Sequence, residues 1–415
     1  MTALFERRGF RDLFIGQSIS AFGDWMVTFA IMWLALKYSG SSTAVGGVLV
    51  LRLLPTALAG SAVSRVVGRW DRRRAMLLMD LVRAAIVLAI PFVRGLWWLY
   101  VWAFVLELCG LVFLPARDAA VPDLVEDDDL PQANGLVMVS SFGTIPLGAG
   151  AFAVMSALTP DHGWGARFPF LPAFAFDAAS FLVSFAVIYR LSEVRVAVER
   201  EEHEDAPTPR MRDALKLPLV RAVMPATVVI SVGLGTLFSL GVVYIRDVLG
   251  TNDAEFGVLI VLFGVGASLG LGLLTRLGDV DRIRIVQLGT FAQGLTIGVM
   301  SLSPWIGPAF LGAAAFGGAT ACTLATGISV LQEGLDGDER VLALATFHVV
   351  IRGGLALAAM GAGVAGDLVG SAHLPVLGHL EPSRIVLLCA GGLTVLGSGL
   401  IRVPAGAPST AEPAS

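Results

Sequence analysis

The sequence predicts an all-α membrane protein in which twelve spanning helices form two six-helix halves. Only 15% of the 415 residues are charged and 55% are hydrophobic, whereas a soluble globular domain carries about 25% charged residues. Apolar runs recur along the chain and are far longer than the roughly ten-residue strands of a membrane barrel. In lipid, such runs form helices because only helices and closed barrels satisfy every backbone polar group. One charged stretch that contains prolines divides the runs into two sets.

Twelve segments meet the requirement of about 20 mostly apolar residues for a spanning helix. In the first half we expect helices near 12–37, 43–66, 75–93, 96–116, 134–157 and 168–189. In the second half we expect them near 219–245, 254–276, 284–302, 305–331, 341–369 and 383–402. The first segment is too long for the roughly 7–15-residue core of a signal peptide, so we expect it to remain as a spanning helix.

The segments define one bundle at 1–190 and a second at 219–402, joined by a charged linker at 191–218. The C-terminal residues 403–415 are small, polar and proline-containing, and we expect them to be disordered. Arginines gather at the N-terminus, after the second and eighth helices, and in the linker. Because cytoplasmic loops carry an excess of basic residues, we expect both termini to be cytoplasmic.

The loop between the second and third helices follows in part the sequence pattern of a known protein family. Arg69, Arg72 and Arg73 occupy its basic positions, whereas Gly68 stands where the pattern has Asp and Asp71 where it has Gly. Further similarity lies in "QSISAFGDW" near the start, "DLVRA" in the third helix, "LPARDAAVPDLVEDDDLPQANG" after the fourth helix, and its counterpart "LQEGLDGDERVLALATFHVVIRGG" after the tenth. In these stretches the chain resembles the major facilitator superfamily, and within it the exporter branch of the enterobactin exporter and Tap-like multidrug efflux pumps.

This resemblance implies the major facilitator fold, with nested inverted repeats and a substrate site near the bilayer midplane between the halves. It implies a secondary active transporter that exports amphipathic drugs or siderophore-like compounds by proton antiport with alternating access. It also implies that the loop motif latches the outward-closed state, for which Asp71 would have to replace the Asp missing at Gly68. We expect a monomer in the cell membrane, with substrate, protons and lipid as partners and no cofactor, metal or nucleic acid.

Two other functions stay open at this point. A lipid or lysophospholipid flippase would need a lateral opening, which a sequence does not reveal. A polytopic membrane enzyme could start from His348 and a nearby acid, but neither a nucleophile elbow nor an HExxH pattern occurs.

Three ionisable residues interrupt apolar helices of the first half at a similar expected depth: Asp24, Arg52 and Glu107. A charge at the centre of a spanning helix costs about 2.5–3.5 kcal/mol on insertion scales, so it usually faces a cavity or a partner. We therefore expect Asp24 or Glu107 to carry the transported proton, with Arg52 tuning that carboxylate. The alternative is a static Asp24–Arg52 pair that holds two helices together.

Other residues are assigned to conformational change or packing. In the fifth helix, "FGTIPLGAGAF" resembles the antiporter motif of the superfamily, with candidates Gly143, Pro146, Gly148 and Gly150. Asp80 and Arg83 lie three residues apart in the third helix and can pair on one face. Asp177 in the sixth helix has no assigned function beyond packing or a polar network.

Aromatic and methionine side chains suit varied apolar ligands because they adapt to different shapes. On the helices expected to line the cavity, the candidates for substrate contact are Trp25, Phe29, Trp33, Met138, Phe142 and Phe238. His348 and Arg352, one turn apart in the eleventh helix, are added because a histidine can change its charge near neutral pH.

Overall fold

A computed structural model shows the helical architecture of the protein. It describes residues 2–67, 71–126, 129, 133, 136–137, 140, 144–159, 162–191, 211–250, 253–274, 276, 280–303, 305–335, 337–374 and 378–401. The chain divides into two compact units whose residues contact one another more than they contact the other unit. The first unit comprises Met1–Gly40, Gly47–Asp205 and Asn252–Val261, and the second comprises Ser41–Gly46, Ala206–Thr251 and Leu262–Ser415.

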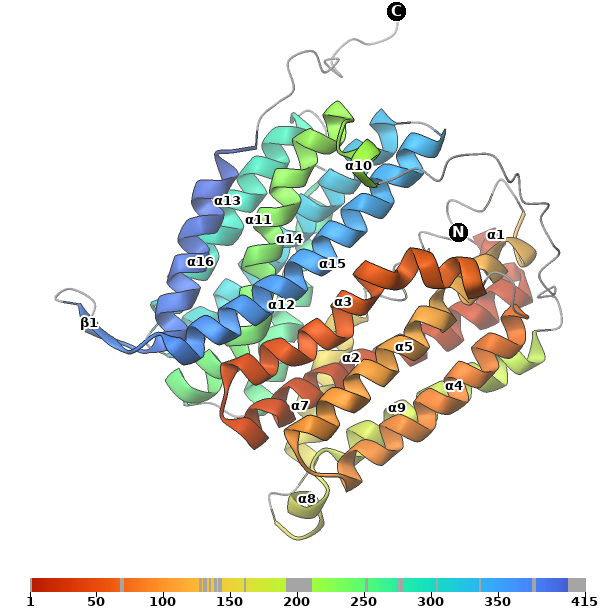
Figure 1. The fold of residues 1–415 in the computed structure, drawn as a ribbon, viewed down its shortest axis with the longest axis horizontal. Coiled ribbons are helices and arrows are strands. Elements are labelled where there is room, and N and C mark those ends of the chain that lie inside the picture. The colour runs from red at the N-terminus through yellow and green to blue at the C-terminus, as the bar shows by residue number, and fades with distance from the viewer. Residues whose placement is uncertain are drawn as a thin grey trace, which may run out of the picture. The chain divides into compact units, whose positions relative to one another are not determined.

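The elements before the central linker are all helical. They are α1 (Thr2–Glu6), α2 (Arg8–Ser39), α3 (Ser42–Val67), α4 (Arg72–Ala89), η1 (Ile90–Phe92), α5 (Leu96–Ala120), η2 (Val121–Asp123), α7 (Ile145–Leu158), α8 (Trp164–Arg167) and α9 (Leu171–Arg190). Within the first unit, α9 packs against α2 and α4, α4 against α5, and α2 against α7. Figure 1 shows α2, α4, α5 and α9 running side by side.

The elements from the linker onward include one small hairpin. They are α10 (Met211–Ala214), α11 (Pro218–Val243), the π-helix η4 (Tyr244–Val248), α12 (Asp253–Leu274), α13 (Arg282–Ser301), α14 (Ile306–Gly334), α15 (Gly337–Leu368), β1 (Ala372–Leu374), β2 (Gly378–Leu380) and α16 (Pro382–Ser398). In the second unit, α11 packs against α15 and α16, and α13 packs against α14 and α16. Figure 1 shows these helices as neighbours.

The spanning helices agree with the predicted fold class. Among the described residues, nine helices are long and apolar enough to cross a membrane. Three shorter apolar helices lie at Ser42–Pro55, Leu147–Leu158 and Pro382–Ser398, where three further spans were predicted. The structure is therefore an all-α membrane fold consistent with twelve spans. The tail at 403–415 and most of the linker lie outside the described residues.

Several boundaries differ from the prediction for local reasons. The second half begins with Pro218 in the first turn of α11, where the missing N–H of proline would have no helical partner in any case. The last helix ends at Ser398, four residues before the predicted end. The antiparallel hairpin of β1 and β2 was not predicted, because three-residue strands are too short to show an alternating pattern.

An acidic residue caps the first turn of α3 within the second unit. Asp367, near the end of α15, accepts hydrogen bonds from the backbone N–H groups of Ser42 at 2.8 Å and Thr43 at 3.0 Å, and from the Ser41 hydroxyl. The first N–H groups of a helix lack partners within it, and the negative charge also meets the positive end of the helix dipole. The Asp367 carboxylate therefore caps the start of α3.

Candidate functional site

Asp24 lies on α2 between two arginines from neighbouring helices of the first unit. Arg52 on α3 places its Nη2 3.7 Å from Asp24 Oδ1, and Arg83 on α4 places its Nη1 3.8 Å from Asp24 Oδ2. The Asp24 side chain is 29% exposed, and both arginines are more deeply buried. The carboxylate therefore links α2, α3 and α4 by charge, and part of its surface remains exposed.

Arg83 is held on several sides. It donates a hydrogen bond to Asp80 on the preceding turn of α4, with 2.5 Å between Nη2 and Oδ1. Its guanidinium carbon lies 4.1 Å from the ring centroid of Phe113 and 4.4 Å from that of Phe181. Cation–π contacts of this kind strengthen when they are desolvated. Together with the hydrogen bond to Asp80, they hold the Arg83 guanidinium in one position.

The predicted Asp80–Arg83 pair is thus present, but its arginine also reaches Asp24. The sequence assigned this pair to conformation or packing, apart from the proposed proton site. One feature of the sequence could have connected this pair to Asp24. Arg83 is a second arginine inside an apolar helix of the same half, and such a charge needs a partner. The partner lies on another helix, and spacing within one helix does not identify it.

Asp177 on α9 lies against α2 at Gly23, the residue before Asp24. A Cβ atom added to Gly23 would lie 2.3 Å from Asp177 Oδ1 and 2.8 Å from Ser180 Oγ. The side chain of Asp177 is fully buried, and it interacts electrostatically with Asp24, Arg52 and Arg83. We call Asp24, Arg52, Asp80, Arg83 and Asp177 the charge cluster.

Polar side chains continue from the charge cluster between α2 and α9. The Gln17 amide donates a hydrogen bond to the Ser184 hydroxyl at 3.0 Å, and both side chains are buried. Polar groups buried among helices are usually hydrogen-bonded because an unpaired one is costly. The contact between α2 and α9 is therefore partly polar.

Glu107, the second predicted proton carrier, lies on α5 in a partly exposed position. The ion pairs described for Asp24 are those with Arg52 and Arg83. The role of Glu107 stays a prediction.

The predicted aromatic residues of α2 lie in a packed cluster. The ring of Phe256, at the start of α12, lies 5.9 Å from the rings of both Phe29 and Trp33 and 6.4 Å from that of Phe152. Phe29 and Trp33 are buried, whereas Trp25, next to Asp24, is partly exposed. Of these three, Trp25 offers the most surface to a ligand in this structure.

The remaining substrate candidates belong to the second unit or lie outside the described residues. Phe238 on α11 packs against Phe263 with 6.4 Å between ring centroids, and His348 and Arg352 are partly buried on α15. The predicted residues Met138, Phe142, Gly143, Gly68 and Arg69 lie outside the described part of the chain.

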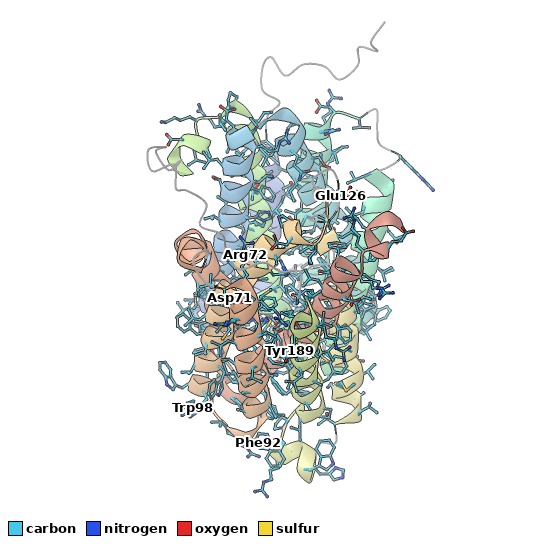
Figure 2. All side chains as sticks on the ribbon, turned by 90° about the vertical axis from the view of Figure 1, so that its right-hand side faces the viewer. Asp71, Arg72, Phe92, Trp98, Glu126 and Tyr189 are labelled. Atoms are coloured by element: carbon cyan, nitrogen blue, oxygen red, sulfur yellow. The ribbon has the colours of Figure 1, made fainter. Side chains whose placement is uncertain are left out.

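The loop motif ties together the ends of three helices in the first unit. Asp71 caps α4 by accepting a hydrogen bond from the backbone N–H of Arg74 at 3.0 Å. Arg72 pairs with Asp123 at 3.3 Å, just after α5, and Arg73 donates to the carbonyls of Ile188 and Tyr189 at the end of α9. Figure 2 shows Asp71 and Arg72 toward the opposite end of the unit from Phe92 and Trp98, which follow α4 and begin α5. These contacts act within one unit, and the latch between the halves stays a prediction.

Close packing surrounds the glycines of the antiporter-like motif. A Cβ on Gly148 would lie 2.8 Å from Trp25 Cβ and 2.9 Å from the carbonyl oxygen of Phe22, so α7 contacts α2 beside Asp24. A Cβ on Gly150 would lie 2.9 Å from Val261. Pro146 occupies the first turn of α7, where a proline is tolerated without a lost hydrogen bond.

We expect Gly148→Val to lower the free energy of unfolding by about 1–3 kcal/mol, the usual cost of overpacking a close contact. The added side chain would meet the backbone of α2, which cannot rotate away. The measurement is thermal unfolding of the purified full chain in detergent. Gly110→Val is the matched control, because a Cβ at that position on α5 has no atom within 4 Å. Equal unfolding midpoints for the two variants would contradict the close α2–α7 contact.

Comparisons with known proteins agree with this architecture. The family model described as Major Facilitator Superfamily matches residues 13–252. The MFS-type transporter YvqJ of Bacillus subtilis, itself uncharacterized, is 22% identical over 389 residues, which cover 90% of each chain. A candidate bacilysin exporter of Bacillus subtilis, BacE, is 27% identical over 276 residues, which cover 64% of this chain and 66% of that protein. Among solved structures, the nucleoside transporter NupG is similar in fold, with a TM-score of 0.73 at 10% identity over 95% of this chain and 98% of NupG.

Proposed function

The chain belongs to the Major Facilitator Superfamily, and from this premise we propose that it exports amphipathic small molecules, such as drugs or siderophore-like compounds, by proton antiport with alternating access. The similarity to a protein named as a candidate bacilysin exporter supports the direction of transport. Bacterial relatives of the same family support a place in the cell membrane. The excess of arginines in four segments supports cytoplasmic termini.

The observation that carries the proposal is the position of Asp24 between Arg52 and Arg83. When Asp24 is ionised, its negative charge attracts both arginines. Once it takes up a proton, its attraction to both arginines falls and the link between α2, α3 and α4 weakens. A ligand shifts a conformational equilibrium only if its affinity differs between the two states. In this proposal the ligand is the proton, and it binds Asp24 more tightly in the state in which the arginines are farther away.

In this mechanism Arg52 and Arg83 share one task. Both arginines attract Asp24 when it is ionised and lose that attraction when it is protonated. Proton uptake and the conformational change are coupled in this way. Glu107 on α5 is the second candidate for proton uptake. Asp80 keeps Arg83 in place when Asp24 is neutral, because its hydrogen bond to Arg83 remains.

The side chains near the charge cluster support the proposed substrate class. Trp25 adjoins Asp24 and α7, and its partly exposed ring offers an apolar surface beside a negative charge. A molecule with an apolar body and a polar or cationic group fits such a surface. In the second unit, Phe238, His348 and Arg352 supply further aromatic and polar candidates.

Everted membrane vesicles that contain the full chain test this function. With an imposed proton gradient, acid inside, we expect accumulation of amphipathic probes such as ethidium and proton release from the vesicles when the probe is added. Collapse of the gradient with nigericin should abolish the accumulation. Probe flux that ignores the gradient would contradict antiport and favour a facilitator or a flippase, and product formation without transport would favour an enzyme.

A further inference from the structure

Asp80 and Asp177 are the two acids of the charge cluster without exposed surface, and Asp177 is the one that forms no ion pair among the described residues. Oδ1 of Asp177 lies 3.1 Å from the Ser180 hydroxyl, which shares its one hydrogen between this oxygen and the backbone carbonyl oxygen of Asp177 at 2.8 Å. Its other oxygen, Oδ2, is buried without a hydrogen-bond partner in the part of the chain that the structure describes. Burying an ionised carboxylate is costly unless a cation and hydrogen bonds compensate it, and a single hydroxyl is weak compensation.

The charged neighbours of Asp177 come from three helices. The helices packed against α9 are α2, α4 and, over a smaller area, α7. Titratable or charged groups near Asp177 are Asp24 on α2, Asp80 and Arg83 on α4, and Arg52 on α3. The described residues of α7 include no titratable side chain.

The charges of the cluster do not balance if every acid is ionised. Three carboxylates face two guanidinium groups, which leaves one negative charge unmatched. Arg52 pairs with Asp24, and Arg83 pairs with Asp24 and Asp80. Asp177 forms no ion pair among the described residues, so a proton on Asp177 is the simplest way to neutralise the cluster.

A glycine in α2 makes room for Asp177 next to the backbone that carries Asp24. The glycine before Asp24 has no side chain, and the Asp177 carboxylate fills the position that a Cβ on Gly23 would take. Asp24 itself is partly exposed. One acid is thus sealed inside the bundle, and its neighbour is accessible from outside it.

We propose that Asp177 is a second proton-binding residue of the transport cycle, and that it exchanges its proton with Asp24. In the exchange, the O–H bond on Asp177 breaks and an O–H bond forms on Asp24, so the negative charge moves from Asp24 to Asp177. Loss of charge at Asp24 then releases the arginines. This inference rests on the proton antiport proposed above and extends it to a residue on α9.

Infrared spectroscopy of the full chain in an ester-free detergent tests the proton on Asp177 without any substrate. A protonated carboxyl group has a carbonyl stretching band that a carboxylate lacks. We expect this band at neutral pH in the wild type, its loss in Asp177→Asn, and its retention in Asp213→Asn. Asp213 is the control because it lies on α10, 49% exposed, and pairs with Lys216. A complete band in Asp177→Asn would overturn the proposal.

A second variant keeps the test valid if Asp177→Asn does not fold. Ser180→Ala leaves Asp177 in place and removes the hydroxyl that donates to it. We expect the same band to remain and to shift in frequency, because the hydrogen bond to the carboxyl group is lost. A merely structural, ionised Asp177 would give no such band, and its absence from both the wild type and Ser180→Ala would overturn the proposal.

Transport measurements separate this inference from the proposed function. In everted vesicles with ethidium as the probe, Asp177→Asn is expected to lose proton-driven accumulation by roughly tenfold or more, as for an acid within a proton relay, and to keep downhill flux. If wild-type flux ignores the proton gradient, antiport fails, whereas the infrared band still decides whether Asp177 is protonated. If the wild type is coupled and Asp177→Asn is coupled equally well, the inference about Asp177 fails alone.

Discussion

Arg83→Met is expected to lower the free energy of unfolding by about 3–5 kcal/mol, the cost of removing one partner from a buried ion pair. Asp80 has no exposed surface, and Arg83 is the cation to which it is bonded. Methionine preserves much of the apolar contact with Phe113 and Phe181 but removes the charge. Unfolding of the purified full chain in detergent, followed by helical circular dichroism, measures the change.

Two further variants identify the cause of this loss. Arg74→Met is the matched control, because Arg74 is 87% exposed on the same helix and pairs with Asp71 at 3.4 Å; surface pairs contribute about 0–1 kcal/mol. Asp80→Asn combined with Arg83→Met should recover part of the stability, since no uncompensated charge then remains. If Arg83→Met unfolds like Arg74→Met, Asp80 does not depend on Arg83.

Asp24→Asn is expected to reduce proton-driven export by roughly tenfold or more, because ionisable residues inside membrane helices form proton relays. Asparagine has nearly the same shape as aspartate but cannot take up and release a proton. Downhill flux of the same probe should persist, since the change leaves the helices in place. Accumulation of ethidium in everted vesicles, with and without a proton gradient, provides both measurements.

Glu107→Gln in the same assay distinguishes the two predicted proton carriers. Loss of coupling in Asp24→Asn alone assigns the proton to the charge cluster, and loss in Glu107→Gln assigns a share to α5. Asp213→Asn, on the surface, should behave as the wild type. Normal pH-coupled transport in both Asp24→Asn and Glu107→Gln would refute the proposed mechanism and leave the Asp24–Arg52 pair a static link between helices.

The spans were predictable from the sequence because hydropathy is a local property. A run of apolar residues long enough to cross a bilayer forms a helix wherever it lies in the chain, since lipid offers no other partner for its backbone. For the same reason Asp24, Arg52 and Glu107 stood out, because a charge inside a spanning helix is costly. The short hairpin at Ala372–Leu374 and Gly378–Leu380 had no comparable signal.

Within the candidate site, the sequence separated residues that the structure brings together. Asp80 and Arg83 were paired correctly by their spacing, yet Arg83 was assigned to conformation and Asp177 to packing. Their distances to Asp24 depend on which faces of α2, α4 and α9 meet. No spacing along one helix contains that information, because helix packing is set by side chains on both partners.

Sequence alone determined that this chain crosses the membrane many times and keeps a few charges inside its spans, because both facts follow from the cost of polar groups in lipid. Only the tertiary structure decided which charges share a site. The absence of a side chain at Gly23 admits Asp177 beside α2, and α4 turns Arg83 toward both Asp80 and Asp24. These contacts join residues far apart in the chain, and electrostatic energy depends on their separation in space.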